Sequence, residues 1–243
     1  MARIRSYSAK QIRRTMRKYV LASQEFRVAP GIDVRVVAVD DAYTLFDRMV
    51  EQEARQLRRP ERYPYWAEVW PAAVALAQWF AMADSAPAPA RALELGCGLG
   101  LVGVALARLG WQVEATDYVE DALVLTAHNA HLNQVSMGLS VGYLDWNHPT
   151  GATAPYVVAS DVLYDPANHA PLVRALHRLL EPSGWFYTSD PRRAPAQRFV
   201  GLLTDRGYEH AVHCVRLQWR GGEHTVDIHA FGKPAAPAAR GRC

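Results

Sequence analysis

The sequence predicts an α/β fold in which a doubly wound, mostly parallel sheet ends in an antiparallel hairpin. Between residues 92 and 190, short apolar runs alternate with helix-like runs, which is the pattern of βαβ units. Residues 210–219 and 223–232 then alternate polar and apolar side chains on either side of Arg-Gly-Gly, a hairpin signal. Because the carboxyl ends of parallel strands share one edge, this pattern predicts a ligand crevice along that edge.

Length and composition favour one main domain. The chain has 243 residues, of which 50% are hydrophobic and 21% are charged, enough apolar material for a sizeable core. We expect an N-terminal extension over residues 1–60 that packs on the core and a main domain over residues 61–233. A Pro/Ala-rich, disordered tail is expected over residues 234–243.

Charge and cysteine usage argue against several function classes. The net charge is only +3 and its basic excess is local to the N-terminus, so no nucleic-acid partner is expected. The three cysteines follow neither a disulfide framework nor a zinc spacing, and no metal is expected. No run approaches the roughly 20 apolar residues that span a bilayer. We therefore expect a monomeric, cytoplasmic protein that does not bind membranes.

Four elements precede the alternating region. Apolar residues at helical spacing predict a helix over residues 8–26, and residues 31–39 alternate in the manner of a strand. Residues 41–57 again have helical periodicity and lead into a charged stretch that we expect to be a loop. The apolar run over residues 70–82 has the length of a buried helix, with Pro71 suited to its first turn.

The alternating region contains five strands and three helices. Apolar runs of strand length separate longer amphipathic runs, and the run over residues 156–162 is nearly all apolar, as a strand buried on both faces should be. The expected strands are 92–95, 112–117, 140–146, 156–162 and 184–190, and the expected helices are 101–110, 119–133 and 169–181.

A glycine-rich turn follows the first of these strands. Its alternate residues are Gly96, Gly98 and Gly100. A bare backbone at the start of a helix is a common support for a nucleotide-like ligand. The dinucleotide fingerprint would need a glycine at Leu101, and a carboxylate at Glu94 would repel a pyrophosphate, which argues against an NAD-linked oxidoreductase. Asp117 ends the next strand, where it can accept hydrogen bonds from ribose hydroxyls. A cationic nucleoside without phosphate, such as S-adenosylmethionine (SAM), fits these two acids.

As a set, these motifs resemble motifs one and two of the class I, seven-strand, Rossmann-like methyltransferases, whose reversed last strand is similar to the terminal hairpin expected here. The resemblance implies that SAM is the cofactor. It implies a cofactor site formed by Trp66, Glu94, Gly96, Gly98, Gly100, Asp117, Asp145, Trp146 and Ser160. Asp145 and Trp146 lie where the class binds adenine, although Trp146 fits a core aromatic at a sheet edge equally well.

Two further stretches narrow the resemblance. PYWAEVWPAA at residues 64–73 and SDVLYDP at residues 160–166 are similar to the protein-lysine methyltransferases that carry an Asp-x-x-Tyr motif. Within them the sequence most resembles those acting on the electron-transfer flavoprotein β subunit, a resemblance that includes Asp190-Pro191. It implies catalytic roles for Asp161 and Tyr164, with Asp161 attracting and orienting the substrate ammonium. It also implies an aromatic substrate slot that includes Tyr65 and Trp70.

Some residues have simpler interpretations or depart from that pattern. Arg192 and Arg193 stand where a Gly-containing turn is usual, and we interpret them as a solvated pair or as a rim for an acidic partner. Asn129 and Asn133 are expected to be capping or surface residues. Asp-Pro-Pro-Tyr is absent at residues 161–164, which argues against enzymes that methylate adenine or glutamine amino groups.

The sequence therefore favours a SAM-dependent N-methyltransferase that modifies lysine side chains of a protein, with the electron-transfer flavoprotein β subunit as one candidate substrate. One alternative is an N-methyltransferase for small-molecule amines, similar to those that act on nicotinamide. A second is a SAM-binding protein without catalysis.

Overall fold

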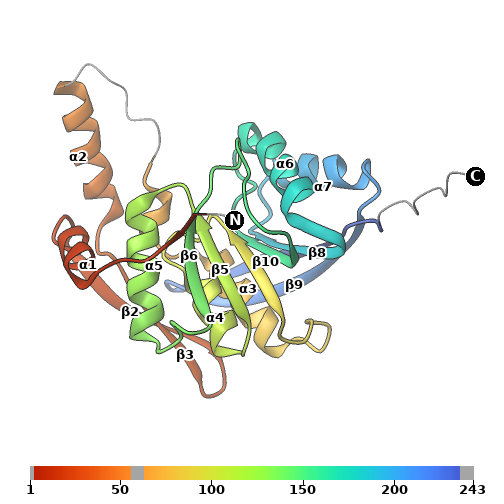
Figure 1. The fold of residues 1–243 in the computed structure, drawn as a ribbon, viewed down its shortest axis with the longest axis horizontal. Helices are drawn as coiled ribbons and strands as arrows, with labels where there is room; N and C mark the ends of the chain where they lie inside the picture. The colour runs from red at the N-terminus through yellow and green to blue at the C-terminus, as the bar shows by residue number, and fades with distance from the viewer. Residues whose placement is uncertain (1–2, 56–62, 236–243) are drawn as a thin grey trace, which may run out of the picture.

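The computed structural model describes residues 3–55 and 63–235, and a single mixed sheet forms its centre (Figure 1). The strand order is β1-β6-β5-β4-β7-β8-β10-β9. The five strands in the middle of this order are parallel, which confirms the predicted fold class. They are β6 (Leu139–Tyr143), β5 (Gln112–Asp117), β4 (Arg91–Leu95), β7 (Ala154–Ser160) and β8 (Leu180–Asp190).

Helices cover both faces of this sheet and create two separate apolar clusters. One cluster contains side chains of α3 (Pro71–Met82), α4 (Leu101–Arg108) and α5 (Glu120–Leu132). The other contains side chains of α6 (His169–Leu179) and α7 (Ala196–Thr204). Helix α7 was not predicted from the sequence. Successive residues of β7 divide between them, with Val157 in the second cluster and Val158 in the first. The apolar composition of this strand thus reflects burial on both sides.

The C-terminal hairpin has the predicted extent. β9 (Glu209–Trp219) pairs antiparallel with β10 (Gly222–Gly232), and β10 lies between β9 and β8, antiparallel to both. In contrast, β6 ends at Tyr143 and not at Trp146 as predicted. Asp145 and Trp146 therefore lie in the loop beyond the strand, at the carboxyl edge of the sheet.

The N-terminal part differs from the prediction. The helix expected over residues 8–26 is wrong in its second half, because α1 spans only Ala9–Met16 and β2 spans Leu21–Ala29. β2 forms a separate two-stranded hairpin with β3 (Ile32–Val39), which was predicted. The turn between them contains Gly31 with φ of +78°, a backbone conformation that favours glycine. Cross-strand pairing thus overrides the helical spacing that continues beyond α1.

An eighth strand was also missed. β1 (Arg3–Arg5) adds to the edge of the main sheet, antiparallel to β6. Three residues are too short to have a periodicity, so only the tertiary structure identifies this strand. The predicted helix over residues 41–57 is present as α2 (Ala42–Arg55), which projects from the body of the molecule near α1 (Figure 1).

Two predicted segments lie mostly outside the described residues. They are the charged loop, mainly at residues 56–62, and the C-terminal tail, mainly at residues 236–243. Within residues 3–55 and 63–235, none of the helices combines the length and apolarity that crossing a bilayer requires.

Candidate active site

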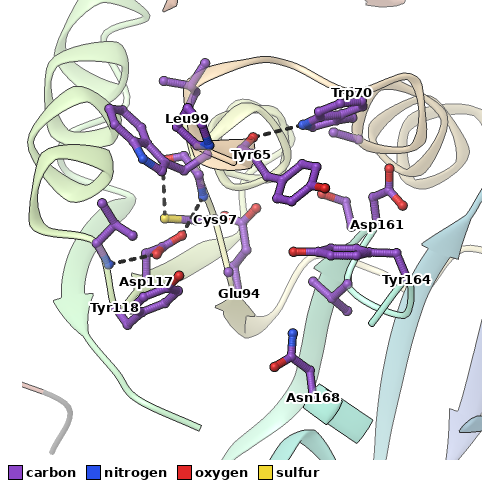
Figure 2. Close-up of a pocket in the computed structure, with 18 of the residues that line it drawn as sticks. Tyr65, Trp70, Glu94, Cys97, Leu99, Asp117, Tyr118, Asp161, Tyr164 and Asn168 are labelled. Atoms are coloured by element: carbon purple, nitrogen blue, oxygen red, sulfur yellow. Dashed lines mark hydrogen bonds between the residues drawn. The ribbon is translucent and has the colours of Figure 1, made fainter. Parts of the chain in front are cut away.

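One large cavity lies at the carboxyl edge of the parallel strands, with a volume of about 1150 Å³ (Figure 2). It brings together almost all of the side chains and glycines singled out from the sequence. They are Tyr65, Trp66, Trp70, Glu94, Gly96, Gly98, Asp117, Asp145, Trp146, Ser160, Asp161 and Tyr164. The residues come from five separate segments of the chain, which the parallel sheet places side by side.

Two glycines of the turn between β4 and α4 belong to the cavity wall. Gly96 and Gly98 line the cavity with φ of +70° and +53°. A Cβ at Gly96 would lie 3.2 Å from the Trp146 ring, and one at Gly98 would lie 3.4 Å from the backbone oxygen of Trp66. A side chain would crowd the Trp146 ring at Gly96, whereas at Gly98 it is the left-handed backbone that favours glycine.

Gly100 has a different position from the one predicted. It is not among the cavity residues but caps the start of α4 in the left-handed conformation, with φ of +76°. A Cβ there would lie 2.5 Å from the Thr126 side chain of α5. Gly100 therefore permits close packing of α4 against α5, and its expected contact with the cofactor is not what this geometry indicates.

Asp117 joins the ends of β4 and β5. Its buried carboxylate accepts hydrogen bonds from the backbone N–H groups of Gly98 at 3.0 Å and Val119 at 2.9 Å. Burial raises its pKa, whereas these backbone hydrogen bonds lower it. Two carboxylate oxygens have more lone pairs than these bonds use, so Asp117 retains the capacity to accept from ribose hydroxyls.

Glu94 lies deeper, at the end of β4. Its side chain is buried, and among the described residues its Oε2 has no hydrogen-bond partner. Burial raises the pKa of this carboxyl to about 8, while a hydrogen bond from the backbone of Gly103 acts in the opposite direction. Glu94 is a cavity-lining residue with an unsatisfied carboxyl group, which suits a ligand with a cationic group, as SAM has.

The loop after β6 forms another wall. The carboxylate of Asp145 accepts from the backbone N–H of Asn147 at 2.8 Å, and this bond is the main reason its pKa is lowered. Trp146 is partly buried and packs against the cluster beneath α6. Both interpretations of Trp146 therefore have support, since the same ring contacts the core and lines the cavity.

An aromatic slot forms the opposite end of the cavity. The ring centroids of Tyr65 and Tyr164 are 5.0 Å apart, and those of Tyr65 and Trp70 are 5.9 Å apart. The indole N–H of Trp70 donates to the backbone oxygen of Tyr65 at 2.9 Å and fixes this segment (Figure 2). The ring of Trp66 makes an edge contact with the ring of Tyr19, with ring centroids 5.6 Å apart.

Asp161 lies beside this slot, but its carboxylate is already paired. The Nε and Nη2 atoms of Arg193 each donate to a different carboxylate oxygen of Asp161 at 2.9 Å. Asp161 has left-handed backbone with φ of +51°, and its N–H donates to the backbone oxygen of Ser189. The carboxylate that the resemblance assigns to a substrate ammonium thus already has a guanidinium partner in this structure.

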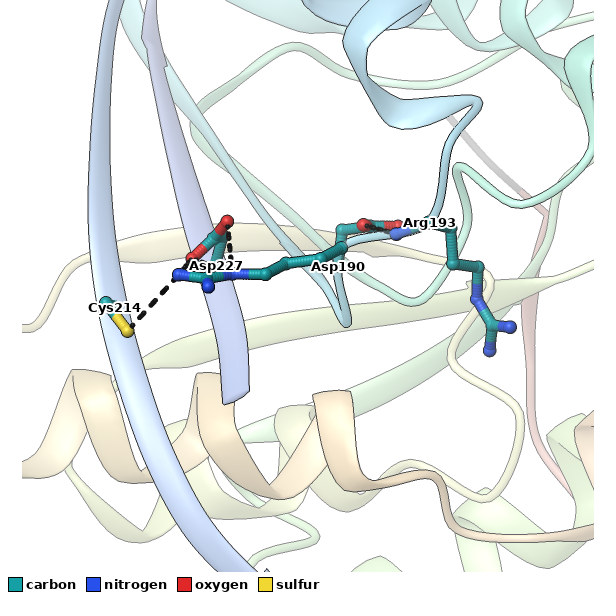
Figure 3. Close-up of polar contacts among 5 residues, drawn as sticks. Asp190, Arg193, Cys214 and Asp227 are labelled. Atoms are coloured by element: carbon teal, nitrogen blue, oxygen red, sulfur yellow. Dashed lines mark hydrogen bonds and ion pairs between the residues drawn. The ribbon is translucent and has the colours of Figure 1, made fainter. Parts of the chain in front are cut away.

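The two neighbouring arginines point to different parts of the molecule. Arg192 pairs with Asp227 of β10 at 2.9 Å, away from the cavity, whereas Arg193 lines it. The buried carboxylate of Asp190 accepts the backbone N–H of Arg193 at 2.7 Å and so fixes the loop after β8 (Figure 3). Arg192 is therefore an exposed residue, as predicted, whereas Arg193 is a partly buried residue of the cavity wall. Two cationic residues follow Asp190-Pro191 at the carboxyl edge, and this position was the signal that could have pointed to Arg193, the second of them, as a cavity residue.

Asn133 is the C-cap of α5, as the capping interpretation predicts, but neither Asn129 nor Asn133 is a surface residue. Both are buried, and their side-chain amides hydrogen-bond the backbone of β3 at Val37 and Arg35. They attach the N-terminal hairpin to the main domain. Their spacing of four residues on one helix face was the available signal, but the β3 backbone that they bind lies about 90 residues earlier in the chain.

A comparison with known protein families shows to which family the chain belongs. A family model described as lysine methyltransferase matches residues 62–206, more than half of the chain. The chain belongs to this lysine methyltransferase family. The matched range contains every cavity-lining residue predicted from the sequence.

Individual relatives are more varied. A ubiquinone biosynthesis O-methyltransferase of Xanthomonas axonopodis pv. citri is 30% identical, over 63% of this chain and 61% of its own. A protein-lysine N-methyltransferase (rrg1) of Schizosaccharomyces pombe is 32% identical, over 49% of this chain and 44% of its own. The chain thus spans less than two thirds of the length of these curated relatives.

Solved structures share the fold. A SAM-dependent methyltransferase of Methanosarcina mazei superposes with a TM-score of 0.53 at 17% identity, covering 70% of this chain and all of that one. The glycopeptide N-methyltransferase MtfA gives 0.54 at 17% identity, covering 65% of this chain and 89% of that one. The fold is that of class I methyltransferases. Their cofactor is SAM, which both the family match and the residues of the cavity indicate.

Proposed function

We propose that this chain is an N-methyltransferase that transfers a methyl group from SAM to lysine side chains of a protein substrate. The observation that carries the proposal is the continuity of the cavity: the glycine-rich turn with Glu94 and Asp117 and the aromatic slot with Asp161 and Tyr164 line the same space. Its volume of about 1150 Å³ exceeds the usual range for a single small-molecule site. A cofactor and an inserted side chain can therefore occupy it together.

In this proposal the residues of the turn hold the cofactor. Asp117 would accept hydrogen bonds from the ribose hydroxyls, and Trp146 would stack on adenine. A bound cation would lower the raised pKa of Glu94 and so favour the charged form that compensates it, and the bare backbone at Gly96 and Gly98 would allow the ligand to lie against the chain. Asp145 fixes the loop that carries Trp146 through its bond to Asn147, and Ser160 and Trp66 complete the walls.

The aromatic slot receives the acceptor amine. Bound SAM would supply an electrophilic methyl group for the amine lone pair, with the electrons of the carbon–sulfur bond passing to sulfur and a proton passing from nitrogen to solvent. Tyr65, Trp70 and Tyr164 exclude water from the amine, and their rings accommodate a methylated ammonium through cation–π contact. Positioning by these side chains supplies much of the rate, because displacement requires an aligned lone pair.

The experiment for this proposal is label transfer. Tritiated SAM and the purified protein are added to a lysate of source cells that lack it, and labelled species are separated by size and hydrolysed. We expect label in a discrete protein band and methylated lysine in its hydrolysate. The Asp117→Ala variant is the matched negative control, and purified electron-transfer flavoprotein β subunit is tested as one defined substrate.

The other outcomes contradict the proposal in distinct ways. Label confined to the small-molecule fraction would indicate an amine or, as in the ubiquinone-pathway relatives, an O-methylated acceptor. SAM binding without transfer to any fraction would indicate a binding protein that lacks catalysis.

A further inference from the structure

The carboxylates beside the aromatic slot are not available to bind a cation. Among the described residues, five carboxyl side chains line the cavity, and three of them, Glu94, Asp117 and Asp145, lie around the predicted cofactor end. The remaining two are Asp161 and Glu68. Asp161 forms its two-bond ion pair with Arg193, and Glu68 lies 3.7 Å from Arg220. Each carboxylate near the slot therefore faces an arginine.

The pair of Asp161 and Arg193 is well held. The Asp161 side chain is only 7% exposed, and Arg193 is 39% exposed at the cavity wall. Two parallel N–H to oxygen bonds of 2.9 Å have the forked geometry that makes arginine–carboxylate pairs strong and specific. Asp190 accepts the backbone N–H of Arg193 and so supports this arrangement from behind.

We propose that Arg193 makes the slot selective for the uncharged form of the acceptor amine, by cancelling the charge of Asp161. This inference rests on the proposed function, because it concerns the amine that the slot accepts. Methyl transfer needs a nitrogen lone pair, whereas a lysine side chain has an ordinary pKa near ~10.4 and is protonated at neutral pH. An unpaired carboxylate would stabilise the ammonium and oppose deprotonation. A paired carboxylate beside a guanidinium and aromatic rings favours the free base.

The other titratable groups near Arg193 are consistent with this selection. Tyr65 and Tyr164 present aromatic rings to each other, and Glu68 is compensated by Arg220. Asp190 lies behind the loop and is not among the cavity residues. Arg193 is therefore a specificity-determining residue, and its effect differs from that of a purely structural ion pair.

The test measures binding of n-butylamine, a lysine side-chain analogue, to the protein saturated with S-adenosylhomocysteine, so that no methyl transfer takes place. Dissociation constants are determined by ligand-observed NMR between pH 7 and 9. If only the free base binds, the apparent affinity of the wild-type protein rises about tenfold per pH unit, following the neutral fraction of an amine with pKa near ~10.4. Binding of n-butanol, which does not titrate, serves as the reference.

Two variants sharpen the result. Arg193→Gln leaves the charge of Asp161 uncompensated, and we expect its affinity for butylamine to become nearly independent of pH and much higher than wild type at pH 7. Arg192→Gln is the matched control and should retain the wild-type profile, since Arg192 pairs with Asp227 away from the cavity. Should Arg193→Gln not fold, the wild-type profile and that of Arg193→Lys, which retains the charge, still decide the matter.

Two results would overturn the inference: wild-type affinity that does not change between pH 7 and 9, or an Arg193→Gln profile identical to wild type. The outcome is separable from that of the proposed function. Selective binding of the free base without label transfer in the lysate would refute the proposed lysine methylation and leave the role of Arg193 intact. Label transfer to protein lysine with pH-independent butylamine binding would do the reverse.

Discussion

The carboxylate of Asp117 accepts a hydrogen bond from the backbone N–H of Gly98 at 3.0 Å, which joins the glycine-rich turn after β4 to the end of β5. This bond brings together the two sequence motifs from which the cofactor was inferred, although 18 residues separate them in the chain. It also means that Asp117 both shapes the turn and is placed to contact the cofactor.

Replacing Asp117 with Ala should weaken SAM binding by tenfold or more. The change removes charge-assisted hydrogen bonds to ribose, each worth about 1.5–3 kcal/mol. Isothermal titration calorimetry measures the loss. Glu181→Gln is the control, because Glu181 pairs with Arg91 at the protein surface. Unchanged affinity in Asp117→Ala would remove Asp117 from the cofactor site.

Replacing Asp161 with Ala should abolish methyl transfer while leaving SAM affinity nearly unchanged. Asp161 lies by the aromatic slot, on the opposite side of the cavity from Asp117 (Figure 2), and without its carboxylate Arg193 loses the partner that holds it at the cavity wall. Calorimetry and the label-transfer assay on the same preparation separate binding from catalysis. Equal losses of SAM binding in the Asp117 and Asp161 variants would refute this division of roles.

Replacing Gly100 with Ala should destabilise the protein more than replacing Gly31 with Ala. The two glycines have nearly the same φ, +76° and +78°, so the backbone strain of the substitution is similar. A Cβ at Gly100 would lie 2.5 Å from Thr126, whereas none of the described atoms lies within 4 Å of a Cβ at Gly31. Urea unfolding should show an additional loss of about 1–3 kcal/mol at Gly100, from crowding between α4 and α5. Equal losses would show that strain alone accounts for both.

Replacing Asn129 with Ala should lower the free energy of unfolding by about 2–5 kcal/mol, because buried groups lose their partners. These are the N–H and C=O of Val37 and the C=O of Leu99. Chemical denaturation measures the effect, with Asn147→Ala as a control at the surface. A loss below 1 kcal/mol would mean that the hairpin of β2 and β3 does not depend on this contact.

Acid should destabilise the protein through His229. Burial is the main reason that the pKa of this imidazole falls to about 4, and His210, whose Nε2 lies 3.1 Å from Nδ1 of His229, adds to the effect. The unfolded chain, with a histidine pKa near ~6.5, binds more protons between these two values, so stability is lost as pH falls from about 6.5 to 4.

We expect this contribution to reach about 3 kcal/mol, from the difference between the two pKa values. His229→Phe should remove it, measured as a smaller decrease in unfolding free energy between pH 7 and pH 4.5 than in the wild-type protein. His148→Gln, at an exposed ring, should retain the wild-type decrease. Asp190, whose pKa is raised to about 6 by burial, acts in the opposite direction but is common to all these proteins.

Periodicity predicted the main sheet because its strands and helices follow each other closely in the sequence. The run over residues 156–162 and the hairpin around Arg220 and Gly221 had patterns that local chemistry explains: burial on two faces and a tight turn. β1 and the second half of the helix expected over residues 8–26 were not predictable in this way. Both depend on pairing with a partner strand, and a partner overrides a weak local preference.

The sequence by itself determined the residue types that meet the ligands. Glu94, Gly96, Gly98, Asp117, Asp161 and Tyr164 follow strands or line turns at the carboxyl edge, so connectivity alone places them together. Only the tertiary structure decided which of these groups already have partners. Arg193 and Asp161 are separated by 32 positions, and their pairing depends on the loops after β7 and β8 folding toward each other. Local sequence does not encode such a meeting of loops, because the pairing of β7 with β8 sets how close the two loops lie.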